Sequence, residues 1–164
     1  FETKSTKTED FAGVTGNRKV PMMHNYGNYN YCEYGGFEAI ELPYGNGDYV
    51  MTVMMSKSKD KLSPEVMSGI VSAMKKEYIS LGFPKFETET DISEFPISSV
   101  KFDSFRHVAK INVDEEGTEA AAVTVIGDTA IAPNAPRELV FNQPFYYVIT
   151  QKSTGVILFV GYYC

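Results

Sequence analysis

The chain has 164 residues, of which 43% are hydrophobic and 22% charged, with a formal net charge of −6. This composition indicates one globular domain with a sizeable core and excludes a disordered chain. The negative charge argues against a nucleic-acid partner, because phosphate binding requires stripes of Lys and Arg. No apolar run approaches the roughly 20 residues of a membrane-spanning helix, so no membrane partner is expected.

The first clearly patterned segments are of strand type. Alternating aromatic residues in the run YGNYNYCEY at 26–34 favour a strand with cross-strand packing, and stacking on sugars or lining an interface is the alternative. Residues 37–55 predict a hairpin, because Pro43 and the sequence Gly-Asn-Gly at 45–47 interrupt two strand-like runs. The second run, from Tyr49 to Met55, is apolar on both faces, which is typical of a strand buried on both sides.

A single helix is predicted over residues 63–77. Ser63 is a suitable N-cap, and Pro64 suits the first helical position. One face is apolar and two cations lie at the C-terminal end, where the helix dipole favours them; the apolar residues are Val66, Met67, Ile70, Val71 and Met74, and the cations are Lys75 and Lys76. We expect this helix to pack on the core and to hold no cofactor.

The segment DEEGTEAAAVTVIGDTAIAPNAP at 114–136 is unusual for an ordinary domain. In a strand, one face would carry Thr118, Ala120, Ala122 and Thr124, and the other Glu119, Ala121, Val123 and Val125. Alanine favours helix and the β-branched residues at 123–126 favour strand, so irregular, helical and late-added strand conformations all stay open. Residues 127–136 have the composition of an exposed loop. Runs at 144–151 and 155–163, separated by residues 152–154, then predict a second hairpin.

Catalytic and metal-binding patterns are scarce. The chain contains no nucleophile elbow, phosphate-binding loop, dinucleotide fingerprint or zinc-protease motif, so no enzyme and no cofactor are expected. His24 and His107 have no second ligand at metal-binding spacing, so we interpret both as structural and expect no metal site. Cys32 and Cys164 neither require nor exclude an oxidising compartment, and whether they are bonded stays open.

Five blocks resemble the serpin family of serine protease inhibitors, in the order of its C-terminal portion. They are KVPMM (19–23), FEAIELPYGNGDYVMTVMM (37–55), FPKFETE (83–89), HVAKINVDEEGTEAAAVT (107–124) and FNQPFYYVITQKSTGVILFVG (141–161). The resemblance implies an α+β, strand-rich, multi-sheet fold with one clear helix. It also implies that residues 1–164 form a single domain, the C-terminal part of a serpin domain, with a hinge at 114–124 and a reactive-centre loop at about 125–138.

In inhibitory serpins a protease cleaves the exposed loop and forms an acyl-enzyme, and the loop then inserts into the central sheet and distorts the tethered protease. The resemblance therefore implies a serine protease inhibitor that changes conformation and is extracellular or periplasmic. It assigns the hinge to Glu115, Glu116, Gly117, Thr118, Glu119, Ala120, Ala121 and Ala122, and places His107 at the shutter, where the central sheet opens, as a hydrogen-bonding latch.

The family's usual interval from the hinge places the bait bond at Ile131–Ala132, and Ala130–Ile131 is the next choice. Small and aliphatic residues around this bond suit an elastase- or subtilisin-like protease. Arg137 would suit a trypsin-like protease, but it lies well past the expected position.

A whole serpin is roughly twice as long as this chain, so the resemblance implies that the N-terminal half of the fold is absent. The hinge would then need a complementary N-terminal chain, another copy of this chain or the rest of a parent chain to receive it. The alternative function is a non-inhibitory serpin-like module that binds a partner or small ligand, or an inactive truncated fragment.

Overall fold

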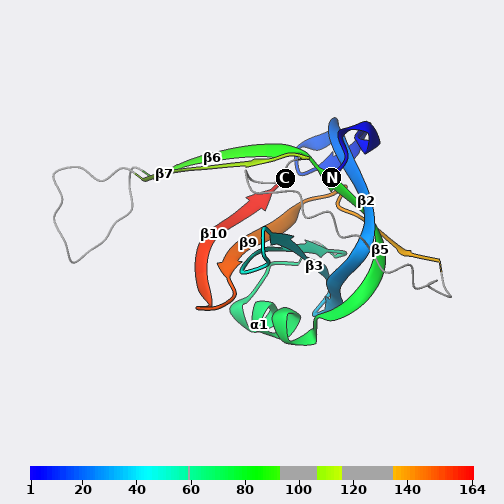
Figure 1. Cartoon of the computed structure of the whole chain (residues 1–164). Coiled ribbons are helices and arrows are strands. Elements are labelled where there is room, and N and C mark those ends of the chain that lie inside the picture. Colours follow the sequence, from blue (N-terminus) through cyan, green and yellow to red (C-terminus); the bar gives the residue numbers. More distant parts are fainter. Residues whose placement is uncertain (59, 93–106, 116–134) are drawn as a thin grey trace.

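An eight-stranded sheet organises most of the chain. The computed structural model describes residues 1–58, 60–92, 107–115 and 135–164, with the backbone alone described at 90–92 and 107–109. The strand order is β10-β9-β4-β3-β2-β5-β8, with β1 paired to β2 (Figure 1). The strands are β1 (Lys7–Gly13), β2 (Gly16–Tyr34), β3 (Phe37–Tyr44), β4 (Tyr49–Ser56), β5 (Lys75–Pro84), β8 (Arg137–Val140), β9 (Phe145–Gln151) and β10 (Val156–Tyr163).

The two predicted hairpins are confirmed. In the turn between β3 and β4, Gly45 and Gly47 have φ angles of 48° and 85°, values that favour glycine. Pro43 does not interrupt the strand, because it lies within β3 and pairs with Val50. All of β4 after its first residue is buried, as its two apolar faces predict. The second hairpin consists of β9 and β10, with a register shift between Ile157 and Phe159.

The one α-helix of the described chain, α1 (Pro64–Ala73), is shorter than predicted. Its N-cap is confirmed, because the Val66 amide donates to Ser63 Oγ (3.3 Å). The predicted C-terminal lysines instead begin β5, where Lys75 pairs with Tyr31 of β2. Pairing along this long ladder takes precedence over the helix propensity of lysine. Of the predicted apolar stripe, Ile70 is fully buried, whereas Val71 is 51% exposed.

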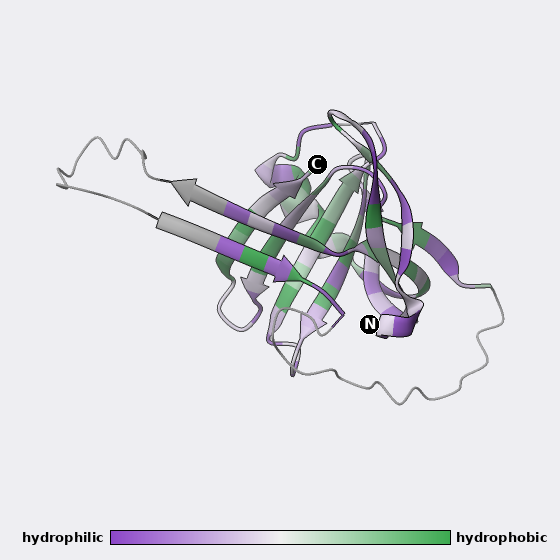
Figure 2. Cartoon of the chain, turned by 90° about the horizontal axis from the view of Figure 1, so that it is seen from above, coloured by the Kyte–Doolittle hydropathy of each residue, from purple (hydrophilic) through white to green (hydrophobic). Residues whose placement is uncertain are grey.

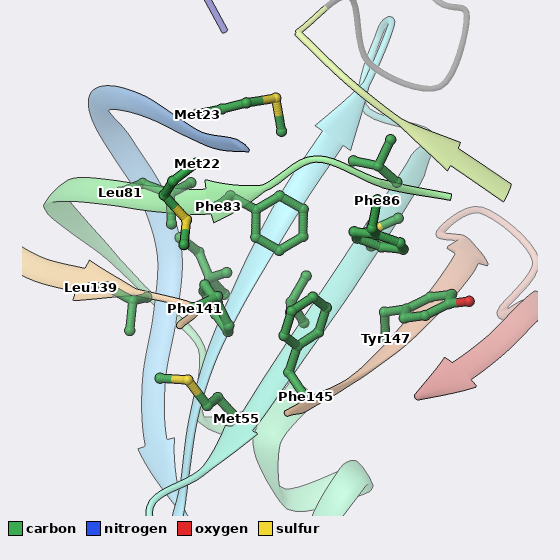
Figure 3. Packing of buried hydrophobic residues seen from close by; sticks show 14 of the residues in the cluster. Met22, Met23, Met55, Leu81, Phe83, Phe86, Leu139, Phe141, Phe145 and Tyr147 are labelled. Carbon is green, nitrogen blue, oxygen red and sulfur yellow. The ribbon is translucent and has the colours of Figure 1, made fainter. Parts of the chain in front are cut away.

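Two hydrophobic clusters lie on opposite faces of the large sheet. The larger cluster has phenylalanine rings at its centre (Figure 3): the Phe83 ring lies 5.5 Å from those of Phe141 and Phe145 and 6.0 Å from that of Phe86. Burying each of these side chains stabilises the fold by about 1.5–3 kcal/mol. The smaller cluster lies under α1 and consists of the buried residues Cys32, Phe37, Ala39, Met54, Ile70 and Val148.

A second sheet forms an arm that extends beyond the large sheet (Figures 1 and 2). It has two antiparallel strands, β6 (Phe86–Ile92) and β7 (His107–Val113). At its base Phe86, Ile111 and Val113 are buried in the larger cluster, and the Thr88 and Tyr147 hydroxyls are hydrogen-bonded (2.9 Å). An isolated pair of strands is only marginally stable, so these contacts at the base fix the arm and the chain that leaves it.

Candidate functional site

The structure places the start of the predicted hinge directly after β7. Glu115 lies within the described chain, whereas the remaining predicted hinge residues, Glu116 to Ala122, lie outside the described residues. The predicted bait residues Ala130, Ile131 and Ala132 lie outside them too. The predicted shutter residue His107 begins β7, where its backbone pairs with Ile92, and its side chain is not among those described.

Glu115 is tightly held at this position. Lys85 Nζ donates to Glu115 Oε2 (2.6 Å), and Thr6 Oγ1 donates to Glu115 Oε1 (2.6 Å). These hydrogen bonds lower the pKa of Glu115 to about 2, and the one from Lys85 has the larger effect. Only 9% of the Glu115 side chain is exposed, against 35% of Lys85. We call Glu115, Lys85 and Thr6 the hinge anchor.

Backbone contacts position the partners of Glu115. Lys85 is the single residue between β5 and β6, and its amide donates to the carbonyl oxygen of Pro21 (2.8 Å). Thr6 follows the short 3-10 helix Thr3–Ser5 and is its C-cap. The backbone nitrogen of Phe1 lies 3.0 Å from the carbonyl oxygen of Glu115. The side chain and the backbone of Glu115 both make contacts, so the predicted hinge starts from a fixed point.

The strand before the anchor has one side available. In the described part of the chain, β7 pairs with β6 and with no other strand. A chain that left β7 and turned back would meet the unpaired N–H and C=O groups of this edge, and it would pair with them antiparallel. Within the described chain, β7 therefore offers one free strand edge next to Glu115.

A second anchor holds the chain where it returns from the predicted loop. Arg137, the first residue of β8, donates from Nε to Glu77 Oε1 (2.8 Å) and from Nη1 to Glu33 Oε1 (3.0 Å). Its guanidinium also lies over the Tyr31 ring, 5.0 Å from the centroid. Burial, with hydrogen bonds to Glu38 and Glu33, raises the pKa of the Tyr31 hydroxyl. Arg137 is thus bound at the start of a strand by both carboxylates.

The remaining candidates have structural surroundings. His24 Nε2 lies 2.7 Å from Glu9 Oε1 on the neighbouring strand, which agrees with a structural histidine. In the run 26–34 Tyr31 is buried in the larger cluster, as expected for a packed strand, whereas Tyr26 is 63% exposed. Both cysteines are free: Cys32 is buried, which raises the pKa of its thiol, and Cys164 is exposed.

Within the described ranges, no three His, Cys, Asp or Glu side chains are grouped so that they could hold a metal ion. The same part of the chain has no helix with the length and apolar character needed to cross a bilayer.

Comparisons with known proteins agree on one family. The sequence model described as "Serpin (serine protease inhibitor)" matches residues 1–95 and 88–164. The chain is 30% identical to Serpin-Z1 of Arabidopsis thaliana over 98% of its own length and 48% of that protein. It is also 30% identical to Serine proteinase inhibitor 2 of variola virus, over 88% of the chain and 51% of that protein.

Solved structures show the same fold. Human thyroxine-binding globulin complexed with thyroxine superposes with a TM-score of 0.81 at 19% identity, over 99% of this chain and 51% of that one. The chain thus spans about half the length of the relatives it matches, in sequence and in structure alike.

Proposed function

Because the chain belongs to the serpin family, we propose that it is the C-terminal portion of a serine protease inhibitor that acts by loop cleavage and strand insertion. The fold is that of serpins with the N-terminal half absent. The bait bond of this proposal is Ile131–Ala132, with Ala130–Ile131 as the next choice, and the target is an elastase- or subtilisin-like serine protease. An extracellular or periplasmic location belongs to the same proposal.

The observation that carries the proposal is the fixed hinge start beside an open strand edge. Glu115 is held by Lys85 and Thr6, and β7, the strand just before it, has one unpaired edge in the described chain. A segment that turned at Gly117 would return along that edge. Each new backbone hydrogen bond contributes about 1 kcal/mol net, so a full strand would release on the order of 10 kcal/mol.

Small side chains in the hinge support the same mechanism. In an inserted strand Thr118, Ala120 and Ala122 would enter the sheet on one face, and Glu119 would point to the other face, toward water. No bulky or charged group would then be buried on entry, and burial of such a group would oppose insertion. This alternation allows the two faces of the hinge to be tested separately.

The test uses two arginine substitutions in adjacent residues. The chain, alone and mixed with the half of Serpin-Z1 that it does not match, is incubated with elastase and then boiled in detergent. In the mixture, we expect a covalent complex for the natural sequence and for the control Glu119→Arg. Thr118→Arg should give cleaved loop and free protease, because an arginine would have to be buried.

A detergent-stable complex formed by Thr118→Arg as readily as by the natural chain would contradict strand insertion. Mass spectrometry of the cleaved chain identifies the bait bond, with a cut after Ile131 expected. A cut after Arg137 would refute the assignment.

A second candidate function follows because the chain spans only about half the length of the relatives it matches. A non-inhibitory serpin-like binding module, or an inactive truncated fragment, would share the fold and lack protease trapping. In the same assay it would give simple cleavage or no reaction for the natural chain and both variants. The small residues of the hinge favour the inhibitor, because a module that never inserts its loop has no need of them.

A further inference from the structure

The turn between β3 and β4 contains the only Asn-Gly step of the sequence, Asn46-Gly47. An asparagine side chain loses its amide most readily when the next residue is glycine, because no Cβ then hinders attack by the backbone nitrogen. Asn46 is exposed, and a Cβ at Gly47 would have no described atom within 4 Å. Neither group is therefore shielded by the rest of the described chain.

The reaction at such a step needs water and no other reagent. The Gly47 nitrogen attacks the side-chain carbon Cγ of Asn46, and a cyclic imide forms as the Cγ–Nδ2 bond breaks. The Gly47 amide proton leaves with the Nδ2 amino group as ammonia. Water then opens the ring: attack at the side-chain carbonyl gives aspartate, and attack at the backbone carbonyl gives isoaspartate, in which the main chain runs through Cβ and Cγ.

Two hydrogen bonds inside the turn act on this reaction in opposite directions. The Asp48 amide donates to Asn46 Oδ1 (3.1 Å), and a donor at this oxygen stabilises the negative charge that develops there during the attack. The Gly47 amide donates to the Tyr44 carbonyl oxygen (2.8 Å), and this bond retains the proton that must leave. The closed turn therefore activates the carbon but withholds the nitrogen, which becomes available when the bond to Tyr44 opens.

The closed turn is held by residues 151–153, at the end of β9 and in the turn that follows. Gln151 Nε2 donates to Asp48 Oδ2 (2.9 Å), and the Ser153 amide donates to Asp48 Oδ1 (3.1 Å). The Lys152 amide donates to the Asp48 carbonyl oxygen (2.6 Å). Because Asp48 directly follows Gly47, these bonds oppose local opening of the turn. We call the contact of Asp48 with residues 151–153 the turn lock.

We propose that Asn46 is a deamidation site and that the turn lock sets the rate of its modification. The exposed Asn-Gly step supplies the reacting groups, and the hydrogen bonds of Asp48 decide how often the Gly47 nitrogen is released. The reaction proceeds from molecules in which the turn is open while the strands stay paired. The proposal concerns the two hairpins of the large sheet and does not depend on protease inhibition.

Modification would act back on the same contact. The register of a hairpin depends on the length of its turn, and isoaspartate adds one backbone atom between Tyr44 and Tyr49, which pair at the end of β3 and β4. Either product also places a second carboxylate two residues from Asp48, and like charges at short distance repel. Both products should therefore weaken the turn lock.

The sequence supplies internal controls for the test. Trypsin releases residues 20–57 as one peptide, which carries Asn46 and also Asn25, Asn28 and Asn30, each followed by tyrosine. The folded chain is incubated at mildly alkaline pH and sampled over time. Tandem mass spectrometry locates the residue that has gained a carboxylate, and chromatography separates the aspartate and isoaspartate forms of the peptide.

Two substitutions loosen the turn lock and leave the Asn-Gly step unchanged. Gln151→Ala removes one side-chain hydrogen bond to Asp48, and Asp48→Ala removes both. The matched control is Gln143→Ala, because Gln143 donates to the Ser56 carbonyl oxygen (3.3 Å) and takes no part in the lock. Far-UV circular dichroism checks that each variant is folded.

We expect Asn46 to react before the three Asn-Tyr steps and to give both aspartate and isoaspartate. Asp48→Ala should speed the reaction at least about fivefold, because loss of two hydrogen bonds favours the open turn. Gln151→Ala should speed it less, and Gln143→Ala should react at the natural rate. Equal rates at Asn46 and at the Asn-Tyr steps, or aspartate as the sole product, would overturn the site. An unchanged or lower rate in Asp48→Ala would overturn control by the turn lock.

Discussion

Neutralising the carboxylate of the hinge anchor should destabilise the chain by a measurable and pH-dependent amount. The perturbation is Glu115→Gln, combined with Lys85→Met in a double-mutant cycle. Each substitution alone removes the 2.6 Å ion pair between Lys85 Nζ and Glu115 Oε2, and the cycle isolates the energy that depends on both groups.

The magnitude follows from the pKa of Glu115, which falls from 4.5 to about 2. At about 1.4 kcal/mol per pKa unit, this corresponds to at most about 3.5 kcal/mol at neutral pH. Lys85 is 35% exposed, so solvent screening reduces the contribution of the pair. We expect a coupling energy of about 1–2 kcal/mol, the range of hydrogen bonds to charged groups.

The pH dependence has a definite sign. Because folding lowers the pKa of Glu115, its contribution is complete above about pH 4.5 and is lost as the pH falls toward 2. The hydrogen bond to Glu115 raises the pKa of Lys85 above 10.5, so the contribution of the lysine is complete below that pH and is lost above it. The coupling should therefore be constant between about pH 5 and 10.

The assay is urea unfolding followed by circular dichroism, at pH 7 and pH 3. The matched control is the pair Lys110–Glu87, which has the same 2.6 Å distance but whose side chains are 55% and 56% exposed. Its double-mutant cycle should give a coupling indistinguishable from zero. Equal couplings for the two pairs, or a Glu115–Lys85 coupling that does not decrease at pH 3, would refute the reasoning.

Three further substitutions test other parts of the structure. Gly161→Ala should destabilise the fold by about 1–3 kcal/mol, because the new Cβ would overlap the buried Tyr147 ring. Gly27→Ala, where the nearest atom would be 3.4 Å from the new Cβ, should change the urea midpoint little. Arg137→Met should speed amide hydrogen exchange across β8, since it removes both ion pairs of that strand; unchanged exchange there would argue against the second anchor. Ser63→Ala should lower stability by about 1 kcal/mol through loss of the helix cap, and an unchanged thermal midpoint would contradict that role.

Local chemistry made much of the fold predictable. The Gly-Asn-Gly turn, the doubly apolar β4 and the Ser63-Pro64 helix start each depend on neighbours in sequence, and each is confirmed. The end of α1 was not predictable in this way. Lys75 continues a helical pattern, but its partner in the sheet is Tyr31, and pairing along β2 is decided by tertiary structure.

The two anchors could not be predicted from the sequence, for a related reason. Thr6 and Glu115 are 109 residues apart, and Glu33 and Arg137 are 104 residues apart, so no short spacing connects them. Lys85 stands in the block FPKFETE, which matched the family, and that position was the one available signal. Lys85 is a charged residue between the buried residues Pro84 and Phe86, whereas the position of Arg137 in the sequence bears only on its suitability as a bait residue.

The chain beyond the loop is built deeply into the large sheet, and this has a consequence for any protease cut between residues 116 and 134. β9 lies between β4 and β10, and β8 lies alongside β5, while Phe141 and Phe145 are fully buried. A nicked molecule should therefore travel as one particle in native gels and columns. Its two pieces should separate only in denaturant, so an intact elution profile would be no sign that the loop had escaped cleavage.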